Sequence, residues 1–133
     1  MSDTAVRPTI YLKKTCPFSL KLFIFLTEAG LADRFERVVF ADGDETHQKL
    51  RSRMEEQGVK PSFPAAEIAP GKLETGSDEL IARFAEDAGV DPAGLPLLQY
   101  YSHGVFEKYG EMYGKLRDLA DQQPEPPAPL AGV

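Results

Sequence analysis

Residues 10–19 read Ile-Tyr-Leu-Lys-Lys-Thr-Cys-Pro-Phe-Ser, and this stretch predicts a strand that turns directly into a helix. The β-branched and aromatic residues at its start are typical of a strand. Pro17 fits the first turn of a helix, because its missing N–H group would have no partner there. The only cysteine of the chain, Cys16, is therefore expected at a helix N-terminus, close to Lys13 and Lys14.

A cysteine in this position has two interpretations. The free N–H groups of a helix start carry about half a positive charge, and a neighbouring ammonium group adds to it. Both favour the thiolate, which is the nucleophilic form of cysteine. Alternatively, Cys16 is a partly buried and unreactive residue beside an ordinary N-terminal proline, since cysteine is among the most buried residue types. The local sequence leaves both interpretations open.

The remaining patterns predict an α/β fold in the order β-α-β-α-β-β-α. Leu20, Phe23, Ile24 and Leu26 give the first helix an apolar face, and Gly30 follows as a stop signal. A helical connection of this length makes the first two strands parallel. The predicted elements cover residues 9–12, 17–29, 35–40, 45–57, 60–68, 72–75 and a last helix from 77 towards 89.

The C-terminal third is predicted to add one helix. Residues 90–97 form a linker after a domain that spans 8–89. Apolar residues then recur at helical spacing, which predicts a single helix over 98–121 that packs back on the domain. The tail, residues 122–133, holds four of the eleven prolines and is expected to be disordered.

Composition narrows the class of protein. With 133 residues, 42% hydrophobic and 27% charged, the chain suits one globular domain. The net charge of −6 argues against nucleic-acid binding. One cysteine forms no internal disulfide, and neither a signal peptide nor an apolar run long enough to span a membrane is evident. We therefore expect a cytoplasmic protein with no membrane span.

Three short segments should meet at one end of the predicted sheet. They are Thr15-Cys16-Pro17-Phe18-Ser19, Phe63-Pro64 and Gly76-Ser77-Asp78. With these segments in this order, residues 8–89 resemble the glutaredoxin-like thioredoxin fold, and more narrowly the glutathione-binding N-terminal domain of glutathione transferases. The Cys-Pro-Phe-Ser run looks most like the cysteine-type branch, which includes omega-class transferases, dehydroascorbate reductases and intracellular chloride channel proteins. The resemblance implies a three-layer thioredoxin-like sandwich with one additional C-terminal helix.

The resemblance also implies a role for Cys16 and its neighbours. Cys16 would be the nucleophile that forms a mixed disulfide with glutathione, flanked by Pro17 and Phe18 in the glutathione site. Pro64 would be a cis-proline, and the Phe63 backbone would pair with the cysteinyl backbone of glutathione.

Charged and polar residues would complete the glutathione site in this resemblance. Ser77 and Asp78 would hold the γ-glutamyl carboxylate at a helix start, which is a suitable place for an anion. Lys13 would meet a second glutathione carboxylate. No metal is expected, and His47 and His103 are assigned no role because they are isolated from other metal-binding residue types.

The chain departs from these families at three places. Gly76 stands where transferases usually carry Glu or Gln, and Ser19 replaces the second cysteine of dithiol glutaredoxins. A single C-terminal helix replaces the all-helical domain of a transferase. We therefore expect a glutathione-dependent monothiol oxidoreductase that acts on a small or protein thiol or disulfide.

Two other functions compete with this prediction. One is a non-catalytic, transferase-like module that binds a protein, or a second copy of the chain, through its aromatic C-terminal helix. Most aromatics of that helix should pack inward, but Tyr100, Phe106 and Tyr113 do not share one face. The other is an iron–sulfur carrier, which Pro17 opposes because monothiol carriers typically have glycine after the cysteine.

Overall fold

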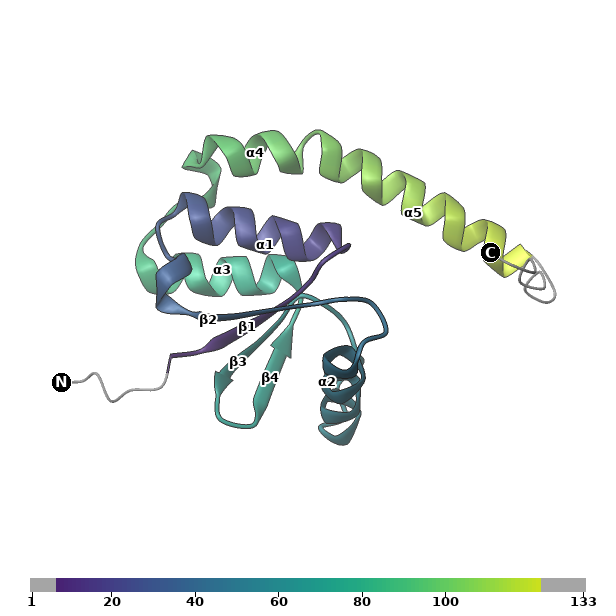
Figure 1. The fold of residues 1–133 in the computed structure, drawn as a ribbon. Helices are drawn as coiled ribbons and strands as arrows, with labels where there is room; N and C mark the ends of the chain where they lie inside the picture. Colours follow the sequence, from purple (N-terminus) through teal and green to yellow (C-terminus); the bar gives the residue numbers. More distant parts are fainter. Residues whose placement is uncertain (1–6, 123–133) are drawn as a thin grey trace.

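The computed structural model describes residues 7–122, and these build an α/β fold around a four-stranded mixed sheet (Figure 1). The order of strands and helices predicted for residues 9–88 is confirmed. The predicted disordered tail lies outside the described residues, except Gln122, which ends the last helix. The elements, with η for a 3-10 helix, are β1 (Thr9–Lys13), α1 (Pro17–Glu28), η2 (Ala32–Arg34), β2 (Glu36–Phe40), α2 (Glu45–Glu56), β3 (Ala65–Ala69), β4 (Lys72–Thr75), α3 (Ser77–Ala88), η3 (Pro92–Gly94), α4 (Pro96–Ser102) and α5 (Val105–Gln122).

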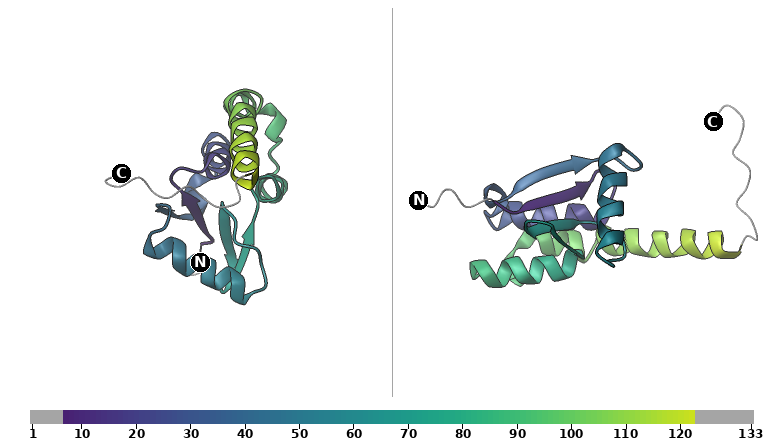
Figure 2. Two further views of the ribbon diagram at one scale, coloured as in Figure 1. Left: turned by 90° about the vertical axis from the view of Figure 1, so that its right-hand side faces the viewer. Right: turned by 90° about the horizontal axis from the view of Figure 1, so that it is seen from below.

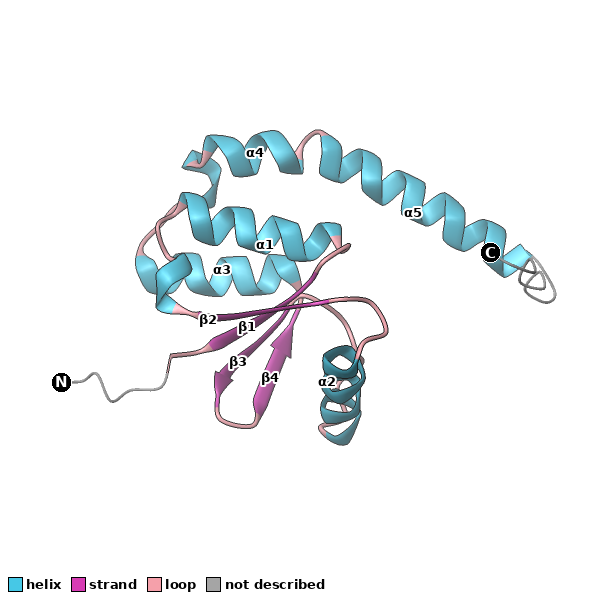
Figure 3. Ribbon diagram, in the orientation of Figure 1, coloured by secondary structure: helices cyan, strands magenta, loops and turns pink. Residues whose placement is uncertain are grey.

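The strands lie in the order β2-β1-β3-β4, and their directions bring four connecting segments to the same end of the sheet (Figure 3). β1 and β2 are parallel, with Lys13 opposite Phe40, as the helical connection predicted. β3 runs antiparallel to β1 and β4, and Ala65 lies opposite both Tyr11 and Thr75. The segments that follow β1, β2 and β4 therefore meet the segment that precedes β3.

Helices cover both faces of the sheet (Figures 1 and 2). On one face, α1 and α3 bury a cluster that includes Leu22, Phe25 and Leu80. On the other face, α2 is held by Leu50 and Met54, which pack in one cluster with Phe40, Ala65 and Leu73. The helix predicted over residues 45–57 is thus present as α2. Burying a Leu or Met side chain contributes about 1.5–3 kcal/mol, so both residues help to hold α2 against the sheet.

The buried face of α1 differs from the predicted one. Leu22, Phe25 and Leu26 are buried, whereas Leu20 is 46% exposed and Phe23 is half-buried. Because α1 is apolar at nearly every position from Leu20 to Leu26, its periodicity does not identify the face that meets the sheet.

The prediction of one helix over 98–121 is wrong, because α4 and α5 are separate helices joined at His103-Gly104. A side chain at position 104 would come within 3.0 Å of the Tyr100 carbonyl oxygen, so the close turn suits glycine. α4 packs back on the domain through Leu98 and Tyr101, which are buried. Much of α5 extends beyond the sheet (Figures 1 and 2).

A carboxylate from α1 fixes the start of α4. The two Glu28 oxygens accept hydrogen bonds from the backbone N–H groups of Leu97 and Leu98, each at 2.8 Å. Backbone N–H groups in the first turn of a helix have no acceptor within the helix itself, and here Glu28 provides one. The predicted linker over 90–97 thus contains η3 and the first residues of α4. None of the helices in residues 7–122 combines the length and apolar character needed to cross a bilayer.

Candidate active site

Cys16 is the N-cap residue of α1, so the prediction that its thiol stands at a helix start is confirmed. Its backbone is extended, with φ −97° and ψ 119°, and Pro17 is the first helical residue. The Sγ atom accepts a hydrogen bond from the Ser19 N–H at 3.4 Å. The side chain is half-buried. The thiol therefore lies at the N-terminal end of α1 and is partly accessible.

Backbone hydrogen bonds hold the loop before Cys16 in place. The Lys14 N–H donates to the Phe40 carbonyl at 2.9 Å, and the Cys16 N–H donates to the Lys13 carbonyl at 3.1 Å. The Ser19 hydroxyl accepts from the Lys13 N–H at 3.1 Å and is 2% exposed. Ser19 thus ties the end of β1 to the first turn of α1.

Phe63 and Pro64 lie directly beside Cys16. Their peptide bond is cis, as predicted. The Phe63 carbonyl oxygen is 3.7 Å from the Cys16 Sγ, within range of a weak S–H hydrogen bond. Pro64 is fully buried, and its carbonyl accepts a hydrogen bond from the Gly76 N–H at 3.3 Å. Phe63 and Pro64 therefore connect the Cys16 loop to the start of α3.

The N-cap residue of α3 is Gly76 and not Ser77, although serine is a common N-cap residue. Gly76 takes that position with φ 102°, a conformation that favours glycine, and Ser77 is the first helical residue. Ser77 is buried. Asp78 is in the first turn, where its carboxylate pairs with the Lys21 ammonium at 2.8 Å.

These predicted residues share one depression beside the Phe63-Pro64 step. Phe18, Phe63, Ser77 and Asp78 all line it, and its volume is about 360 Å³. Phe18 is 42% exposed, and its ring packs edge-on against the ring of Phe106, with 5.2 Å between the two ring centroids. The structure thus brings four of the predicted site residues together, although Asp78 already has a partner within the chain.

Lys13 lies on another side of Cys16, in a polar hollow of about 500 Å³. Its ammonium is 3.0 Å from Asp42, and its hydrogen bond to that carboxylate holds the pKa of Asp42 below its usual value. The hollow is lined by Lys13, Cys16, Asp42, His47, Arg51, Glu55, Lys60, Pro61, Ser62 and Phe63. Its basic side chains could hold an anionic group next to the thiol.

His47 has a position that sequence reasoning missed. It is buried, its Nδ1 accepts a hydrogen bond from the Gly43 N–H at 2.8 Å, and its ring packs against Phe40 and Phe63. With Nδ1 as acceptor, a neutral ring carries its proton on Nε2. The sequence did contain one indication of this position. His47 comes after a strand predicted to run parallel to the strand before Cys16, so both residues follow strand ends on the same side of the sheet.

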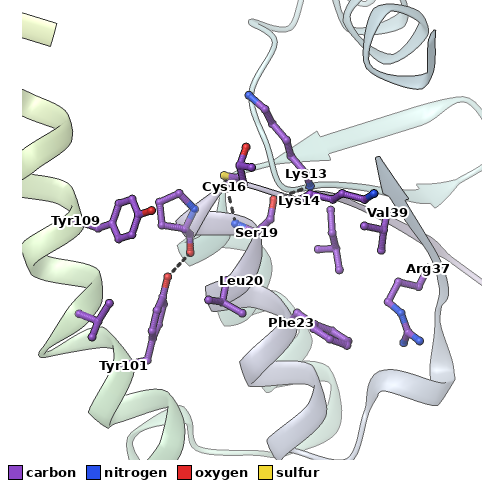
Figure 4. A pocket seen from close by; sticks show the side chains of 14 residues that line it. Lys13, Lys14, Cys16, Ser19, Leu20, Phe23, Arg37, Val39, Tyr101 and Tyr109 are labelled. Atoms are coloured by element: carbon purple, nitrogen blue, oxygen red, sulfur yellow. Dashed lines mark hydrogen bonds between the residues drawn. The ribbon is translucent and has the colours of Figure 1, made fainter. Parts of the chain in front are cut away.

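An apolar groove of about 400 Å³ opens on the remaining side of Cys16 (Figure 4). Leu20 and Phe23 of α1 and Val39 of β2 form part of its wall. The wall opposite comes from Tyr101 of α4 and from Val105 and Tyr109 of α5. The Tyr109 ring points from α5 toward the Cys16 end of α1 (Figure 4).

Tyr101 joins this groove to the helix that carries Cys16. Its hydroxyl donates a hydrogen bond to the Pro17 carbonyl at 2.7 Å. Burial raises the pKa of Tyr101, and the negative charge of a Cys16 thiolate raises it further. The sequence predicted inward packing for such aromatics, which holds for Tyr101. It missed the groove, because no sequence signal located the turn between α4 and α5.

Comparison with protein-family models gives no match, and comparison with curated proteins gives none either. Among residues 7–122, no three His, Cys, Asp or Glu side chains lie together as metal ligands do. Cys16 and the three hollows near it therefore make up the candidate site.

Proposed function

We propose that this chain is a glutathione-dependent monothiol oxidoreductase of thioredoxin-like architecture, with Cys16 as its nucleophile. The observation that carries the proposal is the position of Cys16, a half-buried thiol that caps the first turn of α1 and opens onto the hollows on both sides of it. The element order and the strand order β2-β1-β3-β4 support the architecture. So does the resemblance of residues 8–89 to the N-terminal domain of cysteine-type glutathione transferases.

In the proposed reaction, the Cys16 thiolate attacks the glutathione sulfur of a mixed disulfide between glutathione and a substrate thiol. A Cys16–glutathione disulfide forms, and the substrate sulfur leaves as a thiolate that takes a proton from water. A second glutathione thiolate then attacks the glutathione sulfur bound to Cys16. This step releases oxidised glutathione and restores the Cys16 thiolate, so that glutathione is oxidised as the substrate is reduced.

The surroundings of Cys16 suit the two halves of such a substrate. Lys13, Arg51 and Lys60 of the polar hollow could meet glutathione carboxylates, with a carboxylate replacing Asp42 as the partner of Lys13. Ser77 offers a hydroxyl at the start of α3, beside Phe63. The apolar groove on the side of α5 could take the rest of the disulfide.

The second candidate function is a non-catalytic module that binds a protein. It is favoured by the ion pairs Lys13–Asp42 and Lys21–Asp78, because two residues proposed to bind glutathione are engaged within the chain. In this function the groove would be a docking surface, and Cys16 would not catalyse a reaction.

The two functions are separated by turnover of a glutathionylated peptide in the presence of free glutathione. We expect the wild-type chain to accelerate release of the peptide thiol, and Cys16→Ser to return the rate to the uncatalysed one. The exposed α1 variant Thr27→Ser, equally conservative, should keep the wild-type rate. A wild-type rate equal to the uncatalysed rate, or a Cys16→Ser rate equal to the wild-type rate, would exclude the oxidoreductase.

A further inference from the structure

Helix α5 carries an exposed apolar stripe with the spacing of a coiled-coil seam. Its members are Val105, Tyr109, Met112, Leu116 and Leu119, separated by four, three, four and three residues. This alternation is the heptad pattern by which one helix packs against another. Each of these side chains is between 45% and 64% exposed. We call these five residues the α5 stripe.

The domain covers only the start of α5. Phe106 anchors the first turn. The centroid of its ring is 5.2 Å from that of Phe18 and 5.6 Å from that of Tyr101. The C-terminal part of the helix projects past the sheet (Figures 1 and 2). Gly110 and Gly114 each cost helix stability of about 1 kcal/mol relative to alanine, and most helical stability in proteins comes from the packing of an apolar face. An α5 that stays helical therefore needs a second surface against its stripe.

We propose that this surface is the α5 stripe of a second copy of the chain, packed antiparallel. A heptad stripe is self-complementary, so the same residues serve both copies in a two-fold dimer. Charge does not oppose the pairing, because α5 contains three basic residues and four acidic ones, which are Lys108, Lys115 and Arg117 against Glu107, Glu111, Asp118 and Asp121.

The orientation follows from what lies next to the first turn of α5. Val105 and Tyr109 face the groove of their own domain, so a parallel partner would collide with α1 beside that turn. In the antiparallel arrangement the two projecting ends overlap while the two domains lie at opposite ends of the pair. Centred near Gly114, this overlap sets Tyr109 opposite Leu119 of the second copy, and Met112 opposite Leu116 of the second copy.

The dimer would also complete the groove next to Cys16. Tyr109 belongs both to the α5 stripe and to the groove wall. In the antiparallel pair, the end of the second α5 lies beside Tyr109 and covers the open side of the groove. The site proposed for the substrate would then be built from two chains.

Sedimentation equilibrium tests the dimer, from about 5 µM to about 500 µM to cover a weak association through a small interface. We expect the wild-type mass to rise from that of a 14.7 kDa monomer towards twice that value. Met112→Glu with Leu116→Glu places two charges in the stripe and should keep the chain monomeric. The matched control is Gly110→Glu with Gly114→Glu, which adds the same charges at the same spacing on the opposite face, where nothing lies within 4 Å.

This control should dimerise like the wild type. A wild-type chain that remains monomeric over the whole range, or a control that dissociates as fully as the stripe variant, would overturn the proposal. The masses do not depend on turnover, so the result is independent of the proposed enzyme activity.

Cross-linking through introduced cysteines tests the orientation, in a Cys16→Ser background. Tyr109→Cys with Leu119→Cys should give a disulfide-linked dimer under mild oxidation. The two positions of one helix are about 15 Å apart at 1.5 Å per residue, too far for a disulfide within one chain. Leu119→Cys alone should give no linked dimer, and a linked dimer from it alone would show a parallel pair.

Discussion

The hydroxyl of Tyr101 donates a hydrogen bond to the carbonyl of Pro17 at 2.7 Å, although the residues are 84 positions apart. Pro17 follows Cys16 directly, so the contact joins α4 to the turn that holds the thiol. It also fixes one wall of the apolar groove. This hydrogen bond thus connects the C-terminal helices directly to the turn that holds Cys16.

Tyr101→Phe removes this donor and leaves the ring. We expect the free energy of unfolding to fall by about 1 kcal/mol, the usual cost of one lost internal hydrogen bond. Urea unfolding followed by circular dichroism measures the change. Tyr100→Phe is the matched control, because Tyr100 is 79% exposed and lies one residue away. Equal midpoints for wild type and Tyr101→Phe would contradict the role of the hydrogen bond.

Glu28→Ala should loosen α4 from the end of α1. The variant leaves the Leu97 and Leu98 N–H groups without their carboxylate acceptors. Loss of a capping acceptor costs about 0.5–2 kcal/mol, so we expect destabilisation in that range and faster amide exchange in α4. Hydrogen exchange with mass spectrometry locates the effect. The exposed α3 variant Glu86→Ala provides the comparison, and equal α4 exchange in both variants would contradict the prediction.

The part of the site that the sequence predicted depends on local patterns and on strand direction. Pro17 marked the first residue of α1 and so placed Cys16 at its cap. A parallel pair followed by a hairpin brought the segments before β3 and after β4 to the Cys16 edge. These inferences require only the order of elements and the turn at Pro70-Gly71.

The part that was missed depends on contacts between residues far apart in the chain. Glu28 caps α4 from 69 and 70 positions away, and no local pattern indicates such a cap. The break at Gly104 was hidden because apolar residues keep a helical spacing across it. Ser77 is a common N-cap residue, but Gly76 takes the cap with a positive φ that serine rarely adopts.

Acid should destabilise the chain partly through Glu67. Its carboxylate accepts a hydrogen bond from the Gly71 N–H and pairs with Arg53 of α2, and these contacts lower its pKa from the ordinary 4.5. A lowered pKa in the folded state gives stability that is present above about pH 4.5 and is lost as the pH falls through the folded pKa. The unfolding free energy should therefore decrease below pH 4.5, and less steeply in Glu67→Gln.

Urea unfolding of both proteins between pH 7 and pH 3 measures this difference. Other groups whose pKa is lowered, such as Asp44, are present in both proteins, so their contributions to the unfolding free energy cancel in the comparison. Identical slopes below pH 4.5 would show that Glu67 makes no contribution to the acid sensitivity.

Lys21 joins three helices near the site, and its removal should weaken their contact in a salt-dependent way. Its ammonium pairs with Asp78 of α3 at 2.8 Å and lies 4.5 Å above the Phe106 ring of α5. A surface ion pair contributes about 0–1 kcal/mol, and a cation–π contact about 0.5–1 kcal/mol. Lys21→Met keeps most of the apolar stem, so we expect a loss of about 1 kcal/mol.

Salt separates the two contributions of Lys21. At about 1 M NaCl the ion pair is largely screened, and the difference between wild type and Lys21→Met should shrink toward the cation–π share. Lys49→Met is the matched control, because its partner Glu45 is also in a helix but both side chains are more than 70% exposed. If Lys21→Met and Lys49→Met have the same small effect at low salt, Lys21 does not anchor α5, and the docking of its first turn depends on Phe106 packing against Phe18 and Tyr101 alone.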